Sequence, residues 1–137
     1  MKSLRKIKNK RILVTAGSVW VPIDKVRVIT NIFSGRLGVT IAELAYGAGA
    51  DVTLLLGPGN VNPAVSNKKR FHVIKYRYFD DLLNLMTHEL KYGRYDVVIH
   101  SAAVSDYYLK NPPTGKIKSG KKSLVLTLFP TIKIVDL

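Results

Sequence analysis

Continuous apolar runs separated by helical stretches are the dominant pattern of this sequence. The main runs are residues 11–15, 51–56 and 95–99, and a shorter one lies at residues 72–75. Apolar runs of this length, without polar alternation, are typical of strands buried on both faces in a parallel sheet. Small residues or glycine follow each main run, and we expect each strand to end there.

A first helix is predicted between the first two strands, at residues 37–48. Its expected apolar face repeats at a spacing of three to four and comprises Leu37, Ile41, Leu44 and Ala48. Ser34 is a candidate N-cap, and Gly49 stands where a C′ glycine ends a helix. The stretch is therefore expected to be an amphipathic helix with defined ends.

A second helix is predicted at residues 80–92, with Asp80 as its N-cap and Gly93 as its stop. The residues expected on its apolar side are Leu82, Leu83, Leu85, Met86 and Leu90. Strands and helices thus alternate along the chain.

This alternation predicts an α/β, Rossmann-like three-layer fold with a mostly parallel sheet in the strand order 3-2-1-4. In such folds ligands bind outside the carboxyl ends of the strands, at the switch point between strands one and four. The loops after Thr15 and after His100 are therefore the first places to look for a site.

The C-terminal part has a different character. Residues 111–123 are rich in Pro, Gly and Lys and predict a surface loop, residues 123–129 alternate like a strand, and Pro130 and Thr131 could open a helix. We expect a basic N-terminal tail at residues 1–10 and one Rossmann-like domain at residues 11–137, with the domain incomplete at its C-terminal end.

Composition narrows the class of protein. The 137 residues are 47% hydrophobic, which excludes a disordered chain, and contain no cysteine, which excludes disulfides. No apolar run approaches the roughly 20 residues that span a membrane, and no secretory signal is visible. A cytoplasmic protein without a membrane association is expected.

Net charge points to an anionic partner, because 22 Lys and Arg face 9 Asp and Glu and give a charge of +13. Nucleic acid, a membrane surface and phosphorylated small molecules all fit this charge. Basic runs at residues 2–11 and 68–70 are interpreted as a solvated tail and a loop. A third run comprises Lys116, Lys118, Lys121 and Lys122.

The loop after the first strand does not fit a dinucleotide-binding turn, because Gly17 and Gly35 stand too far apart for a Gly-x-Gly-x-x-Gly fingerprint. Binding of NAD is therefore disfavoured. Ser34 and Gly35 at a helix start can nonetheless offer N–H groups to a phosphate. Arg36 adds a positive charge there, although an arginine in this position is also compatible with simple solvation.

Three ordered motifs resemble the phosphopantothenate-cysteine ligase family. The first runs from Gly17 through residues 22–24, 26–27 and 30–31 to residues 34–35; the second is residues 101–107, Ser-Ala-Ala-Val-Ser-Asp-Tyr; the third is residues 115–118, Gly-Lys-Ile-Lys. Together they extend the resemblance over residues 11 to about 135.

The resemblance implies a reaction in coenzyme A biosynthesis. The carboxylate of phosphopantothenate attacks the α-phosphate of CTP or ATP, and the cysteine amine then displaces the nucleotide from the acyl-nucleotidyl intermediate. The implied ligands are phosphopantothenate, cysteine, a nucleoside triphosphate and Mg²⁺.

The resemblance also implies catalytic residues. Asn31 matches the family asparagine that holds the acyl intermediate, where an amide can donate to a developing oxyanion; without the motif it would be interpreted as a turn residue. Lys116 matches the lysine on the triphosphate, where an ammonium acts as a point charge. The third basic run becomes a candidate flap over phosphates.

Two binding sets follow from the same motifs. The implied nucleotide-binding residues are His100, Ser101, Ala102, Asp106, Lys116, Phe129, Pro130, Thr131 and Ile132. Asp106 would contact the nucleotide directly or through Mg²⁺, although an Asx-turn is its alternative interpretation. The candidate residues for the substrate phosphate are Gly17, Ser18, Ser34, Gly35 and Arg36.

Departures from the family pattern leave alternatives open. Ser18 and Val19 replace Gly or Pro and Thr, Phe33 replaces a common Ser, and residues 132–133 replace Pro-Asp. The family also continues beyond Leu137 with further phosphate-binding lysines and dimer strands. A non-catalytic remnant, a half-subunit completed by a homodimer partner or a separate chain, and a basic nucleic-acid-binding module remain alternatives, the last disfavoured.

Overall fold

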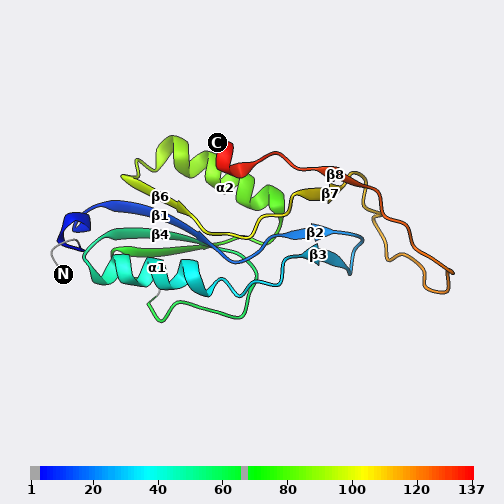
Figure 1. Ribbon diagram of the computed structural model, residues 1–137, viewed down its shortest axis with the longest axis horizontal. Coiled ribbons are helices and arrows are strands. Elements are labelled where there is room, and N and C mark those ends of the chain that lie inside the picture. Colours follow the sequence, from blue (N-terminus) through cyan, green and yellow to red (C-terminus); the bar gives the residue numbers. More distant parts are fainter. Residues whose placement is uncertain (1–3, 66–67) are drawn as a thin grey trace.

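A parallel sheet forms the centre of the computed structural model, which describes residues 4–65 and 68–137. Within these residues the sheet has four strands in the order β5-β4-β1-β6 (Figure 1). They are β1 (Arg11–Ala16), β4 (Asp51–Leu56), β5 (Phe71–Lys75) and β6 (Val97–His100). The predicted α/β class, parallel sheet and 3-2-1-4 order are confirmed.

Strand β1 lies between two parallel neighbours, which explains its apolar run. Ile12 pairs with Val52 of β4 on one side and with Val97 of β6 on the other. Both faces of β1 are covered as well, so every residue of the strand after Arg11 is buried. Thr15 is the one polar side chain of this buried stretch.

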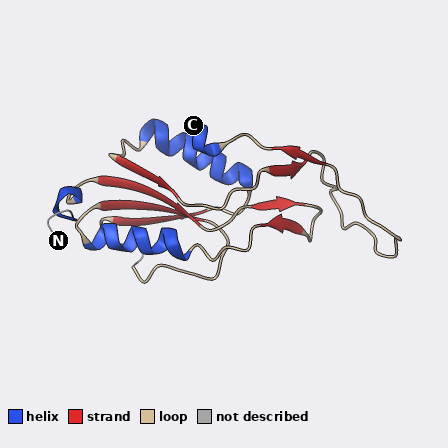
Figure 2. Cartoon of the chain, viewed as in Figure 1, coloured by secondary structure: helices blue, strands red, loops and turns tan. Residues whose placement is uncertain are grey.

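Helices α1 (Arg36–Gly47) and α2 (Phe79–Tyr92) cover opposite faces of the sheet, as Figure 2 shows. Ile12, Val14 and Ala16 pack in the core layer beneath α1, whereas Leu13 packs in the layer beneath α2. Alternate side chains of β1 therefore point to opposite faces of the sheet and contribute to both core layers. No helix in the described ranges is long and apolar enough to cross a bilayer.

The predicted apolar face of the first helix is wrong in part, because Ile41 packs against the core whereas Leu37 and Leu44 do not. Leu37 and Leu44 are 69% and 65% exposed, and the residues of α1 that are buried are Gly38, Val39, Ala42 and Ala45. The small side chains let the helix lie close to the sheet, because a Cβ on Gly38 would stand only 2.6 Å from Cβ of Ala16. Leucine at this face would hold the helix farther away.

Both predicted N-caps are wrong as well. Gly35, in the left-handed region with φ of +80°, is the N-cap of α1, and the Ser34 hydroxyl accepts only a long 3.3 Å bond from the Arg36 N–H. Tyr78 is the N-cap of α2 in place of Asp80. The Asp81 carboxylate accepts the Tyr78 N–H at 2.8 Å and so satisfies the backbone at that helix start.

Both predicted helix ends are confirmed. Gly49 has φ of +94° and donates its N–H to the Tyr46 carbonyl, 2.9 Å away, one residue beyond the C-cap of α1. Gly93 is the C-cap of α2 and donates to the Glu89 carbonyl at 2.8 Å. Glycine thus ends each helix where the sequence indicates.

Two short antiparallel hairpins extend beyond the carboxyl ends of the sheet (Figures 1 and 2). One joins β2 (Trp20–Pro22) to β3 (Val28–Thr30), and the other joins β7 (Tyr107–Leu109) to β8 (Leu128–Pro130). The first hairpin occupies the long loop after β1, where the sequence predicts no strand.

The C-terminal prediction needs two corrections. The strand expected at residues 123–129 is confined to Leu128–Pro130, because its partner β7 is followed by Pro112 and Pro113, which have no N–H to extend the pairing. The helix expected from Pro130 and Thr131 is absent from the described chain, where Pro130 ends β8 and the next helical turn is a 3₁₀ segment, η2 (Ile134–Asp136).

Residues at the N-terminus are tied to the sheet. After a 3₁₀ turn, η1 (Leu4–Ile7), the Asn9 N–H donates to the Gly49 carbonyl at 2.9 Å, and Lys10 pairs with Asp96 at 2.8 Å. The segment that the sequence predicts as a basic tail therefore contacts the amino end of the strands. Lys2, the first residue of that basic run, lies outside the described residues.

Candidate functional site

Thr15 and His100 join the carboxyl ends of the adjacent strands β1 and β6. The Thr15 hydroxyl oxygen accepts the N–H groups of Ser101 and Ala102, each at 3.0 Å, and lies 2.8 Å from Nδ1 of His100. A hydroxyl has two acceptor sites and one proton, so the proton of Thr15 is donated to Nδ1. The ring proton of neutral His100 is therefore on Nε2.

Burial keeps this imidazole neutral. The pKa of His100 is lowered from its ordinary value of 6.5 because desolvation disfavours the charged ring. A neutral ring with Nδ1 occupied offers one hydrogen-bond donor, the Nε2–H group, to a neighbouring ligand.

A pocket of about 190 Å³ lies beside His100. It is lined by His100, Ala102, Val104, Ser105, Asp106, Thr131, Ile132, Lys133, Ile134 and Val135. Two bonds hold its walls together: the Thr131 N–H donates to the Asp106 carbonyl at 2.9 Å, and the Thr131 hydroxyl donates to the Ser105 carbonyl at 2.8 Å. Five residues of the predicted nucleotide set therefore share one pocket.

Asp106 forms an ion pair with Lys133 at the wall of this pocket. The carboxylate raises the pKa of the Lys133 ammonium, which stabilises the charged form. No group of three His, Cys, Asp or Glu side chains suited to a metal occurs in the parts of the chain that the structure describes. One carboxylate that already holds a cation does not fit a protein-built Mg²⁺ site.

Asn31, which follows β3, contacts the segment that follows His100. Its side-chain amide donates to the Val104 carbonyl at 3.3 Å, and its own carbonyl accepts the Ser18 hydroxyl at 2.9 Å. A second pocket, of about 460 Å³, is lined by Ser18, Trp20, Thr30, Asn31, Ile32, Phe33, Ser34, Pro58, Gly59 and Asn60. Asn31 thus connects this pocket with the segment that follows His100.

The residues predicted to bind the substrate phosphate lie where the backbone at Gly35 comes close to the backbone at Gly17. A Cβ on Gly35 would stand 2.8 Å from the Gly17 nitrogen, and both glycines have positive φ, so larger residues fit neither position. Arg36 is exposed at the first turn of α1. Ser18 is buried with its hydroxyl donated to a carbonyl, so its side chain shapes this turn.

Other predicted residues lie apart from the small pocket. Lys116 is exposed in the long loop between β7 and β8 and lines none of the pockets described above. The ring of Phe129 packs against Tyr108 with centroids 6.3 Å apart, and the Lys110 ammonium lies 5.7 Å above it. Ser101 contributes its N–H to Thr15 and does not line the pocket.

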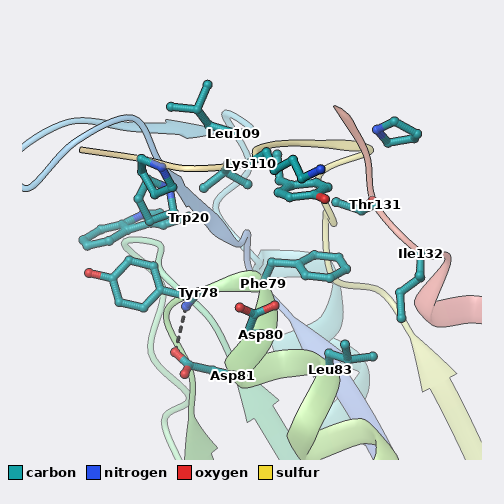
Figure 3. A pocket seen from close by; sticks show the side chains of 15 residues that line it. Trp20, Tyr78, Phe79, Asp80, Asp81, Leu83, Leu109, Lys110, Thr131 and Ile132 are labelled. Carbon is teal, nitrogen blue, oxygen red and sulfur yellow. Dashed lines mark hydrogen bonds between the residues drawn. The ribbon is translucent and has the colours of Figure 1, made fainter. Parts of the chain in front are cut away.

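A larger cavity of about 710 Å³ adjoins the small pocket and shares Thr131 and Ile132 with it. Figure 3 shows Trp20, Tyr78 and Phe79 around this cavity, with Asp80 at the start of α2. Pro130 of the predicted nucleotide set also lines it.

Sequence reasoning missed several residues that organise the site. Thr15 was recognisable as the polar residue that ends a buried apolar run. Asp24 and Arg27 belong to the first motif, but nothing in the sequence indicated that they contact residue 117. Lys133 was noted as a departure from the family pattern, and its pairing with Asp106 depends on the tertiary fold.

Fold and site together define a doubly wound α/β protein with its ligand pockets at the carboxyl ends of the strands, at the switch point between β1 and β6. Residues 7–137 match the DNA/pantothenate metabolism flavoprotein C-terminal domain family. The chain belongs to this family, the phosphopantothenoylcysteine synthetase (phosphopantothenate-cysteine ligase) domain of coenzyme A biosynthesis, whose members use a nucleotide co-substrate.

Curated relatives are longer proteins. The coenzyme A biosynthesis bifunctional protein CoaBC of Thermococcus kodakarensis is 45% identical over 132 residues, which cover 96% of this chain and 31% of the relative. CoaBC of Mycobacterium tuberculosis is 37% identical over 114 residues, covering 82% and 26%. A cysteine/cysteine sulfinic acid decarboxylase from an unknown prokaryotic organism is 34% identical over 125 residues, covering 91% and 33%.

Solved structures share the fold. The C-terminal domain of a CoaBC protein superposes with a TM-score of 0.75 at 34% identity, covering 96% of this chain and 58% of that one. The DNA/pantothenate metabolism flavoprotein from Streptococcus pneumoniae gives 0.79 at 32% identity, covering 92% and 62%. A Cab2 mutant in complex with phosphopantothenate-cysteine gives 0.77 at 18% identity, a likeness of fold.

Proposed function

We propose that this chain provides the nucleotide- and acyl-binding part of a phosphopantothenate-cysteine ligase. The observation that carries the proposal is the pocket in which His100, Asp106 and Thr131 come together at the switch point, with Asn31 bonded to the intervening segment at Val104. The family and the nucleotide co-substrate of its members support the same interpretation.

In the proposed reaction a carboxylate oxygen of phosphopantothenate forms a bond to the α-phosphorus of CTP or ATP, and pyrophosphate leaves. The nitrogen of cysteine then forms a bond to the acyl carbon, the nucleoside monophosphate leaves, and the amine proton passes to solvent. In the first step charge accumulates on the phosphate oxygens, and in the second it develops on the acyl oxygen. A donor fixed beside the acyl group therefore lowers the second barrier.

Each residue contributes binding or orientation. The Asn31 amide donates to the acyl oxygen, after exchanging its 3.3 Å bond to Val104 for the ligand. The Nε2–H group of His100 donates to the nucleotide, because Thr15 keeps its proton on that side of the ring. Lys116 is proposed to contact the triphosphate. The phosphate of phosphopantothenate is proposed to bind at Gly17, Ser34, Gly35 and Arg36.

Mg²⁺ is proposed only as a companion of the triphosphate, since a nucleoside triphosphate carries this ion on its own oxygens. Asp106 is already paired with Lys133, and the described residues provide no group of three metal-ligating side chains that could hold the ion.

A second polypeptide segment is proposed to complete the enzyme. The chain spans about a third of the curated relatives and about three-fifths of the solved ones. In the described residues β6 is an edge of the sheet, and its Val97 and Val98 are each 40% exposed. An open edge with apolar side chains suits pairing with another strand, from a homodimer partner or a separate chain.

The decisive experiment measures pyrophosphate release with phosphopantothenate, cysteine and either CTP or ATP, beside calorimetric binding of each nucleotide. Release that is lost in Asn31→Ala and Lys116→Ala supports catalysis by this chain. Binding without release supports a half-subunit. Lys91→Ala, a change on the exposed last turn of α2, is the matched control for loss of one positive charge.

Absence of nucleotide binding in the parent chain would overturn the proposal. Suppose instead that the chain binds single-stranded nucleic acid and that its affinity for nucleic acid falls steeply as the salt concentration rises. The net charge of +13 would then indicate a nucleic-acid-binding protein.

A further inference from the structure

Asp24, in the turn between β2 and β3, is an unusual carboxylate. Among the residues that the structure describes, it is the one charged residue that is buried, at 4% exposure. Burial of a charge is costly unless the charge is paired and hydrogen-bonded. The contacts of Asp24 therefore indicate what its position serves.

Local contacts satisfy one side of the carboxylate. Oδ1 accepts the N–H groups of Val26 and Arg27, each at 2.9 Å, which closes the hairpin turn. Oδ2 accepts Nε of Arg27 at 3.0 Å and also Nη2 of the same guanidinium. These bonds hold the pKa of Asp24 well below its usual range, with the Arg27 bond as the largest cause.

A distant segment provides the remaining partner. The Ile117 N–H donates to Oδ2 of Asp24 at 2.9 Å, and the Ile117 carbonyl accepts Nη2 of Arg27 at 2.9 Å. Both backbone groups of one residue are thus held by one acid–base pair, 93 residues away in the sequence from the acid. We call this arrangement the Asp24 clamp.

The clamp holds a loop that has little other support. Residues 111–127, the lysine loop, lie between β7 and β8 and extend away from the sheet (Figure 1). Within the described ranges, no other hydrogen bond joins this loop to the rest of the chain. Ile117 and Leu126 are its two half-buried residues, and the others are exposed.

The clamped residue lies between two of the loop's lysines. Lys116 precedes Ile117 and Lys118 follows it, so fixing the backbone at 117 fixes the positions from which both ammonium groups reach out. Arg27 neutralises Asp24 within the clamp, which leaves the charges of the lysines available to an anionic ligand.

We propose that Asp24 is a positioning residue that holds the lysine loop so that Lys116 and Lys118 can engage the triphosphate of a nucleotide. The proposal rests on the proposed function, because it takes the nucleotide as the ligand of Lys116. Ordering a free loop on binding costs conformational entropy for each residue fixed. A loop already anchored at its centre avoids part of that cost.

The test compares Ile117→Pro with Ile117→Ala. Proline removes the N–H that Asp24 accepts, whereas alanine keeps it and removes only the side chain. Both changes lie in the loop, away from the core, so the fold is retained. Asp24→Asn is the companion variant, and Asp96→Asn is its control, because Asp96 also accepts a backbone N–H and a lysine but at the amino end of the strands.

Two measurements are made on each variant: the rate of trypsin cleavage after Lys118 and Lys122 in the free protein, and calorimetric affinity for CTP and for ATP with Mg²⁺. Cleavage after Lys116 is not compared, because trypsin does not cut the Lys–Pro bond that Ile117→Pro creates. We expect Ile117→Pro and Asp24→Asn to be cleaved faster and to bind nucleotide about tenfold more weakly, as loss of a charge-assisted hydrogen bond implies. Ile117→Ala and Asp96→Asn should resemble the parent chain.

The outcomes separate the two proposals. If the parent binds nucleotide and Ile117→Pro and Asp24→Asn bind equally well, the positioning role of Asp24 is wrong while the proposed function stands. If cleavage is unchanged in those variants, the clamp does not order the loop and the inference fails. If the parent binds neither nucleotide, the proposed function fails and the nucleotide role of the loop fails with it, whatever cleavage shows.

Discussion

The Thr15 hydroxyl donates its only proton to Nδ1 of His100, 2.8 Å away, while its oxygen accepts the N–H groups of Ser101 and Ala102. One buried side chain therefore determines which nitrogen of His100 carries a proton and where the loop after β6 begins. The two effects can be separated by substitution.

Replacement of Thr15 by valine should destabilise the fold by about 1–2 kcal/mol, because two part-buried N–H groups lose their acceptor. The Nδ1–H tautomer of His100 should then become detectable by ¹⁵N NMR. Thr15→Ser keeps the hydroxyl, so it should retain the parent tautomer. A valine variant that keeps the Nε2–H form alone would contradict the assignment.

The free energy of unfolding should depend on pH through His100. Because burial lowers the pKa of His100 below 6.5, the unfolded chain binds this proton more readily than the folded chain. Stability is thus complete above pH 6.5 and declines as the pH falls toward the lower folded-state pKa. His100→Gln should flatten this slope in urea titrations, whereas His72→Gln, at an exposed position of β5, should leave the His100 contribution in place.

Gly35→Ala should destabilise the protein by at least about 2 kcal/mol, because a left-handed alanine is strained and its Cβ meets the Gly17 backbone. Gly120 has a similar φ of +92° but nothing within 4 Å of an added Cβ. Gly120→Ala should therefore cost only about 1 kcal/mol. Equal shifts in the thermal midpoints of the two variants would show that the close approach at Gly35 is unimportant.

Lys133→Ala should make nucleotide binding more dependent on Mg²⁺. Loss of the ammonium leaves the Asp106 carboxylate without its cation, and a metal-bound triphosphate can replace it. We expect the affinity gain from adding Mg²⁺ to grow about tenfold, measured by calorimetry with CTP. Lys110→Ala removes a charge near Phe129 and serves as the control. No change in the gain would mean that Asp106 does not contact the metal–nucleotide complex.

The sheet was predictable because its central strands, β1 and β4, are short apolar runs buried on both faces. Apolar runs such as residues 51–56 favour strands that are buried in a parallel sheet. The alternation of these strands with helices then favours the observed strand order. The face of α1 was not predictable from spacing alone. Leu37 and Val39 both belong to stretches with helical periodicity, and the choice between them depends on how closely Gly38 lets the helix approach β1.

The pocket residues were predictable only in part. The motif after β6 and the segment after β8 are far apart in the sequence, yet the bonds of Thr131 to residues 105 and 106 bring them together as expected. The hairpin formed by β2 and β3 was missed because each strand has only three residues and little pattern of its own. The contacts of Asp24 and Lys133 depend on the completed fold, so local periodicity contains no signal for them.

The bond between Asp24 and Ile117 also bears on how the molecule folds. It closes a loop of 93 residues, and contacts of such long sequence separation are slow to form. During synthesis the clamp must wait until residue 117 has left the ribosome, long after β1 and α1 have emerged. The lysine loop is therefore anchored at a late stage, so partly made chains lack the arrangement of Lys116 and Lys118 that we propose for phosphate binding.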